Sequence, residues 1–511
     1  MKATLMIAIL AVIVGDSLTA TRAAPPSQRP VGPRLVTREK SLGKTPEEII
    51  AESLVISPNG RRVAYVARRG ERQYVVVDGA AGPEYEMIGK NSSFFSPNSM
   101  QLAYFAGGSG GVCSVVDGVE GQRFDGVAQY NFCYSPDSLR LAYAVRRGSK
   151  WLVVCDGKES AEYDAVEDHT LTFSPDSKRL AFTARRGGRM FVVADGVEGK
   201  GYDAIDGGPW FSPDSRRLAY SAWEGGRGFV SVDGVEQEYD AVGTGTLIFS
   251  PEGSRLAYVA KRGGKLFVVV EGVESPDYDN LELGSLRFSA DGRRLSYVAQ
   301  RAGKWFVVID GKEITRYDDV GSRAPLFSPD SHRVAFLAKR GSRVFIVADG
   351  VEGEKYESIM QDSLSFSRDS RHFGYVATRG GQWFVVVDVV EGKRYEAIGE
   401  DTFAFSPDGK HIGFVAGRGE KPLVVVDGSE GKVYDAIERG GQPTFSPDSR
   451  HVAYVAAQGD KWFFIVDGVK GPEYDSFLPG SRLAFDSATS LYDLAVRDHE
   501  IFCVEVEIRT Q

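Results

Sequence analysis

Three histidines are the first residues in this sequence that invite a metal-binding or catalytic interpretation. His372, His411 and His451 occupy equivalent places in consecutive copies of a repeated segment, where other copies carry an arginine. Metal ligands must converge within a few ångströms of one ion. Equivalent positions on successive repeats are spread over a surface instead, so the pattern indicates solvated turn residues. The sequence predicts no metal site and no cofactor.

Acidic residues recur with the same regularity, as in the Asp-Gly pair at Asp195 and the Tyr-Asp pair at Asp203. Glycosidic chemistry needs one distinctive pair of carboxylates in a cleft rather than a ring of equivalents. An Asp-Gly pair between apolar runs is typical of a tight hairpin, which needs positive φ angles. We therefore expect these acids to cap turns. Because no nucleophile elbow or Cys/His pair is present either, we expect a protein that is not an enzyme.

Basic loops between apolar runs are the strongest candidates for a functional site. They read "RRGER", "RRGSK", "RRGGR", "KRGGK", "RAGK" and "KRGSR", and tryptophans directly follow several of the basic loops. Cations beside aromatic rings can recognise an acidic protein patch or an anionic glycan. Solvated hairpin tips, with the tryptophans shielding a sheet edge, are the alternative. The candidate binding residues are Arg68, Arg69, Arg146, Arg147, Trp151, Arg185, Arg186, Lys261, Arg262, Trp305, Lys339, Arg340 and Trp383.

These loops belong to a segment that recurs twelve times at intervals of 38 to 40 residues, marked by the serine of "FSPD" or its counterpart. Four short strands are predicted in each copy, for example at 171–173, 179–184, 190–195 and 202–205, and no helical period is visible. The two middle strands are apolar on both faces, so protein must cover both sides of each small sheet. This is the pattern of an all-β fold, a β-propeller of twelve four-stranded blades.

The repeated sequence motif also resembles that of a known family. The run "FSPDSKRLAF" and the later "WFVVIDG" are similar to the WD40-like (PD40-type) repeat of the TolB-like β-propellers, and the resemblance extends from about residue 45 to the end. It implies the propeller fold and leaves the activity open. TolB itself carries an α/β domain ahead of its propeller, whereas only a short linker precedes the repeats here. The chain therefore resembles TolB by its repeat and is not TolB.

The grouping and closure of the blades are less direct to predict. Because propellers usually have about 4 to 8 blades, we expect two six-bladed propellers, at 45–272 and 273–511. The uniform spacing keeps a single twelve-bladed ring as the alternative. The last copy has no fourth strand of its own, and "PEEII" (46–50) stands where the fourth strand precedes the next copy. We predict that this segment completes the last blade and covers its edge.

The N-terminus has the features of a secretory signal peptide at 1–23: Lys2, an apolar run at 5–14, and small residues before a cleavage point. The apolar run is too short to span a bilayer, so we expect no membrane insertion. A Pro-rich linker is predicted at 24–44. The protein is thus expected to be exported to the periplasm or the cell exterior.

The four cysteines occupy apolar positions of the repeat, which indicates buried side chains. A disulfide between Cys113 and Cys133 stays open as an alternative, because export would permit it.

Composition narrows the function classes. A net charge of −9 argues against a nucleic-acid-binding protein, which would carry an excess of clustered cations. The leading hypothesis is an exported, non-catalytic scaffold that binds a protein or a cell-envelope polymer through the basic loops. A propeller enzyme, such as a carbohydrate lyase or a peptidase-associated module, and a structural or adhesive surface protein are the alternatives.

Overall fold

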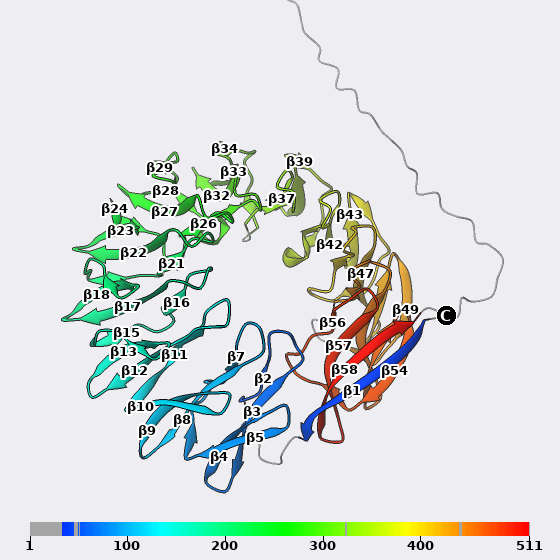
Figure 1. The fold of residues 1–511 in the computed structure, drawn as a ribbon. Coiled ribbons are helices and arrows are strands. Elements are labelled where there is room, and N and C mark those ends of the chain that lie inside the picture. Colours follow the sequence, from blue (N-terminus) through cyan, green and yellow to red (C-terminus); the bar gives the residue numbers. More distant parts are fainter. Residues whose placement is uncertain (1–32, 45–49, 51, 322–323, 439–441, 510–511) are drawn as a thin grey trace, which may run out of the picture.

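The computed structural model describes residues 33–44, 50, 52–321, 324–438 and 442–509. Twelve small antiparallel sheets stand around one open centre, which makes the protein an all-β, twelve-bladed β-propeller (Figure 1). The predicted fold class is confirmed. Helical structure in the described part is confined to two short 3₁₀ turns, η1 (Leu283–Ser285) and η2 (Gln361–Ser363).

The blade around residues 165–198 shows the common plan. Its inner strand is split into β15 (Ala165–Val166) and β16 (Thr172–Phe173), and both pieces pair with β17 (Leu180–Arg186). β17 then pairs with β18 (Arg189–Ala194), and β18 pairs with the outer strand β19 (Val197–Glu198). The two middle strands are the most buried, because neighbouring blades cover both of their faces.

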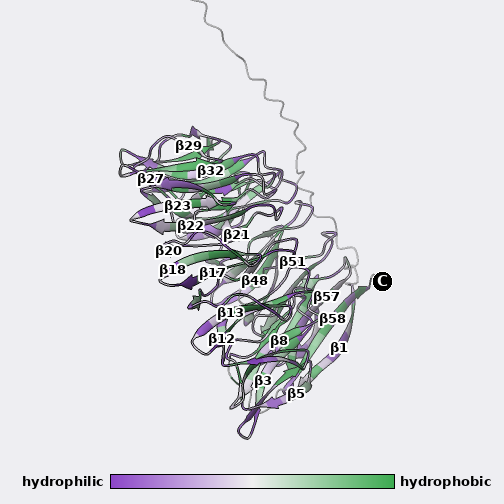
Figure 2. Ribbon diagram, turned by 60° about the vertical axis from the view of Figure 1, so that its left-hand side comes forward, coloured by the Kyte–Doolittle hydropathy of each residue, from purple (hydrophilic) through white to green (hydrophobic). Residues whose placement is uncertain are grey.

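Second and third strands of this kind form the hydrophobic body of every blade, and Figure 2 shows the apolar colouring along them. The second strands are β3 (Val63–Arg69), β8 (Leu102–Gly108), β12 (Leu141–Arg147), β17, β22 (Leu218–Glu224), β27 (Leu256–Arg262), β32 (Leu295–Arg301), β37 (Val334–Arg340), β42 (Phe373–Arg379), β47 (Ile412–Arg418), β52 (Val452–Gln458) and β57 (Ser490–Arg497). The third strands are β4 (Arg72–Val77), β9 (Gly111–Val116), β13 (Lys150–Cys155), β18, β23 (Arg227–Val232), β28 (Lys265–Val270), β33 (Lys304–Ile309), β38 (Arg343–Ala348), β43 (Gln382–Val387), β48 (Lys421–Val426), β53 (Lys461–Val466) and β58 (Glu500–Arg509). We number the blades 1 to 12 in this order.

The predicted fourth strand needs a correction. The segment at 202–205 is divided between two blades: Tyr202 bridges to Met190 in blade 4, whereas Ala204–Ile205 (β20) pairs with β22 of blade 5. The chain crosses from one blade to the next at Asp203. The outer strand therefore lies earlier in the repeat than the sequence pattern indicated.

The preferred grouping into two six-bladed propellers is wrong, and the single ring is correct. Blades 6 and 7 share one continuous hydrophobic cluster, in which Val259 and Val268 pack with Tyr278 and Tyr297. Blades 12 and 1 share another, which includes Leu494 and Tyr65. Two separate propellers would have to break the first of these contacts. The expected boundary at 272/273 also cuts the hairpin between β28 and β29 (Val273–Glu274).

An N-terminal strand closes the ring, as predicted, but a different segment supplies it. β1 (Arg34–Lys44) pairs antiparallel with β58 and forms the outer strand of blade 12 (Figure 1). This part of the predicted linker is thus a strand. Within the predicted closing segment, 46–49 lie outside the described residues, and the amide of Ile50 donates to the carbonyl of Val66 (2.9 Å) on the inner side of blade 1. The one described residue of that segment therefore belongs to the first blade.

Candidate binding face and interblade cavity

All hairpins between second and third strands point to one side of the ring, which we call the loop face. The turns between inner and second strands lie on the opposite side, which we call the turn face. In blade 4, for example, β17 runs from the turn at 174–179 to the hairpin tip at 187–188. The candidate residues of the sequence analysis lie at or next to the tips on the loop face.

The second cation of each basic loop is held by its own blade. In blade 4, Nη1 of Arg186 lies 2.8 Å from Oε1 of Glu198, and its guanidinium lies 4.6 Å from the ring centre of Tyr163 on blade 3. The same kind of ion pair joins Arg69–Glu84, Arg147–Glu159, Arg262–Glu274 and Arg340–Glu352. These five candidates therefore brace the blades, although each exposed pair contributes only modestly to stability.

The Tyr-Asp acids connect neighbouring blades. Oδ1 of Asp164 accepts from Nζ of Lys150 in blade 3 (2.5 Å), and Oδ2 accepts from the amide of Gly187 at the tip of blade 4 (2.8 Å). Lys150 and this amide lower the pKa of Asp164. Asp203, Asp240, Asp279, Asp318, Asp435 and Asp475 each accept from the next hairpin tip in the same way. Their repetition has a structural cause.

The Asp-Gly acids cap their hairpins, as predicted. Asp195 has a φ of 53°, its Oδ1 accepts from the amide of Leu180 (3.0 Å), and its Oδ2 accepts from Nε of Arg179 (2.8 Å). In blade 10 a histidine replaces the arginine, and Nδ1 of His411 lies 2.7 Å from Oδ2 of Asp427. His372 and His451 make the equivalent contacts with Asp388 and Asp467. These histidines are thus parts of turns.

The tryptophans among the candidates lie between blades. Trp151, Trp305 and Trp383 are partly buried and pack against the clusters that join blades 3 and 4, 7 and 8, and 9 and 10. Their main chains form isolated β-bridges with the tyrosine that follows the outer strand of the same blade. Their rings contribute to the seam between blades.

The first cation of each basic loop differs from the second in its ion pairing. Arg185 pairs with Glu167 (2.8 Å), and Nη2 of Arg146 donates to the carbonyl of Asp125 (3.3 Å). In the part of the chain that the structure describes, the exposed side chains of Arg68, Lys261 and Lys339 have no ion pair or hydrogen bond. Of the thirteen candidates, these three have cationic groups available to another molecule.

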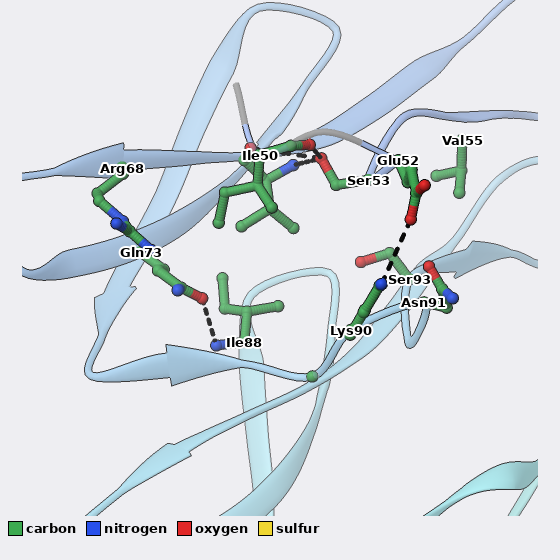
Figure 3. A pocket seen from close by; sticks show the side chains of 12 residues that line it. Ile50, Glu52, Ser53, Val55, Arg68, Gln73, Ile88, Lys90, Asn91 and Ser93 are labelled. Carbon is green, nitrogen blue, oxygen red and sulfur yellow. Dashed lines mark hydrogen bonds and ion pairs between the residues drawn. The ribbon is translucent and has the colours of Figure 1, made fainter. Parts of the chain in front are cut away.

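Arg68 also lines a cavity of about 590 Å³ between blades 1 and 2. The other lining residues are Ile50, Glu52, Ser53, Val55, Val66, Gln73, Ile88, Gly89, Lys90, Asn91 and Ser93. Figure 3 shows Ile50 and Ile88 facing one another across the cavity, with Arg68 on one side and Lys90 on the other. Oε1 of Gln73 accepts from the amide of Ile88 (2.8 Å) and fixes one wall.

The electrostatics of this cavity favour an anionic group. Lys90 is balanced by Glu52 at 3.3 Å, whereas Arg68 has no counterion among the described residues. The Oγ of Ser93 is buried, and no described group satisfies it. Arg68 was identified from the sequence, but Lys90, Asn91 and Ser93 were missed, because they lie in the loop that splits the inner strand. The polar run "GKNSS" at 89–93 is the sequence feature that could have indicated these residues.

A second cavity, of about 540 Å³, lies between blades 4 and 5 and is lined by His169, Thr183 and Trp210 among others. The ring of His169 stacks on that of Tyr130 in blade 3, with 4.7 Å between centroids. The histidine therefore packs against an aromatic ring at the inner rim.

Within the described ranges, no group of three or more His, Cys, Asp or Glu side chains is arranged to hold a metal ion. The four cysteines are all free thiols. None of the helical segments in the described part of the chain has the length and hydrophobicity needed to cross a membrane.

Comparisons with known proteins give only distant structural likenesses. No family model matches the chain, and no curated protein matches its sequence. Among solved structures it is similar to a eukaryotic initiation factor (14% identity, 76% of this chain and 97% of that chain, TM-score 0.33). It is also similar to TolB from Acinetobacter baumannii (15%, 50% and 78%, 0.21) and to the propeller domain of the Trilobed protease from Pyrococcus furiosus (14%, 50% and 91%, 0.24).

Proposed function

We propose that this protein is an exported, non-catalytic scaffold that binds an anionic group of a protein or a cell-envelope polymer through its loop face. The observation that carries the proposal is Arg68, an exposed guanidinium with no described counterion at the edge of an interblade cavity. Lys261 and Lys339 add two free cations on the same face. A guanidinium suits carboxylate, sulfate or phosphate oxygens, because it donates two parallel hydrogen bonds.

The rigidity of the loops supports a binding role. Ion pairs and main-chain hydrogen bonds fix the hairpin tips to their neighbours, as at Asp164 and Gly187. A partner would therefore meet a prearranged surface, and little ordering entropy would be lost on binding. Export is proposed from the N-terminal sequence, whose 1–23 lie outside the described residues.

The test uses a defined polyanion. The mature protein and a triple variant, Arg68→Glu with Lys261→Glu and Lys339→Glu, are eluted from a heparin column with a salt gradient. A matched control reverses three arginines of the turn face, Arg216, Arg371 and Arg450, whose side chains are 85%, 79% and 82% exposed. Both triple variants change the net charge equally.

We expect wild type and the control to be retained to higher salt than the loop-face variant. Pull-downs from an envelope extract at low and high salt then identify the partner, with the same two variants as comparison. Equal loss of retention in both triple variants would show that net charge alone acts, and the loop face would be rejected as the binding surface.

A further inference from the structure

Blade 12 departs from the repeat at one buried position of its second strand. In the other eleven blades this position is aromatic: Tyr65, Tyr104, Tyr143, Phe182, Tyr220, Tyr258, Tyr297, Phe336, Tyr375, Phe414 and Tyr454. In blade 12 it is Asp493, whose exposed fraction is 1%. A lone carboxylate in such a place is unfavourable unless something compensates it.

A second change in the same blade fills part of the space left by the missing ring. The inner-strand position that is aliphatic in its neighbours, as at Ile437 in blade 11, is Phe477 in blade 12. The ring of Phe477 lies 4.7 Å from that of Phe464 and 5.7 Å from that of Tyr474, between centroids. The apolar seam between blades 11 and 12 is therefore kept, although Asp493 stands at its edge.

The hydrogen bonding around Asp493 also differs from that of other blades. In blades 9 and 10 the hydroxyls of Ser363 and Thr402 accept from a second-strand amide, at 2.8 and 3.1 Å. In blade 12 the corresponding amide, that of Leu494, donates to Oδ1 of Asp493 (2.7 Å). The Oγ of Ser481 and Oδ2 of Asp493 are left buried and form no hydrogen bond of good geometry in the described part of the chain, although Ser481 lies close enough to Asp493 to lower the pKa of its carboxyl.

One of these two residues, Ser481, belongs to the wall of a cavity of about 560 Å³ between blades 11 and 12. Ser481, which is 8% exposed, lines it together with Glu438, Tyr454, Val455 and Asp401. Asp493 lies against Ser481 and within electrostatic reach of Glu438. A buried carboxylate and a buried hydroxyl without well-formed hydrogen bonds, next to a cavity, leave acceptor positions open for a further donor.

The charges around the cavity specify the kind of donor. Asp401 and Glu438 form no ion pair with any described residue, and neither does Asp493. Burial, aided by Asp493, raises the pKa of Glu438 to about 7, and burial raises that of Asp493 to about 6. Arg482 also lines the cavity but is exposed. Both carboxyls hold their negative charge at a cost that a bound cation would remove.

We propose that the cavity between blades 11 and 12 binds a primary ammonium group carried on an alkyl chain, with Ser481, Asp493 and Glu438 as its acceptors. An ammonium ion offers three donors, and Tyr454 and Val455 supply a wall for the alkyl chain. The group could come from a free amine or from a lysine side chain of a partner. This site is separate from Arg68 and does not rest on the proposed function of the loop face.

The test is calorimetric titration at pH 8 with two probes: putrescine, as a free amine, and the blocked peptide acetyl-Gly-Lys-Gly-amide. Asp493→Asn and Glu438→Gln are each expected to weaken binding at least tenfold. The matched control is Glu282→Gln in blade 7, because the amide of Glu282 pairs as that of Glu438 does and Tyr297 fills the aromatic position there. This control should bind like wild type.

A repaired blade gives an independent check. Asp493→Tyr combined with Phe477→Ile restores the residue types of the other blades, and it should keep the melting temperature while it abolishes binding. Binding of putrescine alone indicates a free amine, and binding of the peptide alone indicates a partner side chain. The proposal is overturned if neither probe binds, if the three single variants bind alike, or if calcium or magnesium ions displace the probes.

Discussion

Blades 4 and 12 follow one plan but use it differently. In blade 4 the recurring acids of the repeat have structural partners, from the turn at Asp195 to the interblade contact of Asp164 with Gly187. In blade 12 an acid replaces an aromatic ring, and two buried polar atoms form no hydrogen bond of good geometry with the described groups. Repeated residues in this protein therefore hold blades together, and the departures from the repeat are the places to look for binding.

The largest effect on stability is expected from removal of β1, the N-terminal strand that completes blade 12. A protein that begins at residue 45 lacks β1 and exposes the edge of β58. We expect its melting temperature to fall by about 10 °C or more relative to a protein that begins at residue 33. Scanning calorimetry with size-exclusion chromatography measures this. Equal melting temperatures would show that closure adds nothing to stability.

The next effect is a gain in stability. Since the pKa of Asp493 is raised to about 6, folded protein binds more protons than unfolded protein between about pH 4 and 6, and stability falls as the pH rises through this window. Asp493→Asn removes that penalty. We expect it to be more stable than wild type by on the order of 2 kcal/mol at pH 8, and nearly equal to wild type near pH 4.

Urea unfolding at the two pH values gives this difference, and other titrating groups cancel in the comparison. A difference between variant and wild type that does not change with pH would refute the burial argument for Asp493.

A smaller loss is expected from Phe477→Ile. The change removes the ring that packs between Phe464 and Tyr474 and leaves a gap beside Asp493. It should lower the free energy of unfolding by about 1–2 kcal/mol. Adding Asp493→Tyr should recover most of this loss, since the two positions share one space. Strict additivity in the double-mutant cycle would argue against that coupling.

The smallest effect is expected at a regular interblade contact. Asp318 accepts from Nζ of Lys304 (2.6 Å) and from the amide of Gly341 (2.7 Å). Asp318→Ala should lower the melting temperature slightly, because an exposed contact is worth little. Asp318→Asn keeps an acceptor for the amide of Gly341, so its melting temperature should lie between those of wild type and Asp318→Ala. If Asn and Ala behaved alike, the ion pair would be the part that matters.

The repeat made the blade architecture predictable, because a strand that is apolar on both faces needs a sheet on each side. The number of blades in a ring was not predictable, since it depends on small angles between blades that no single residue specifies. The split of "YDAI" was missed because a crossing at Asp203 looks the same as a continuous strand in sequence. β1 was missed because Pro-rich residues precede it and favour a linker interpretation.

The candidate site was only partly predictable. Arg68 was found, but sequence could not separate it from Arg69, whose counterion Glu84 lies on the outer strand of the same blade, β5 (Ala80–Tyr85). Asp493 was available in the sequence as the one non-aromatic residue in an aligned column. It was missed because decay of the last copy hid the column, and its importance depends on burial that only the structure shows.

Pairing of β1 with β58 has a consequence for how the molecule is made. Leu35 meets Ile508, so the contact joins residues from nearly opposite ends of the chain. A chain that emerges from a ribosome or a translocation channel N-terminus first can stack blade upon blade as it arrives. It must nevertheless keep its earliest strand unpaired until the final residues appear. Assembly of the ring therefore depends on whether β58 is synthesised before the unpaired β1 forms a sheet with another polypeptide chain.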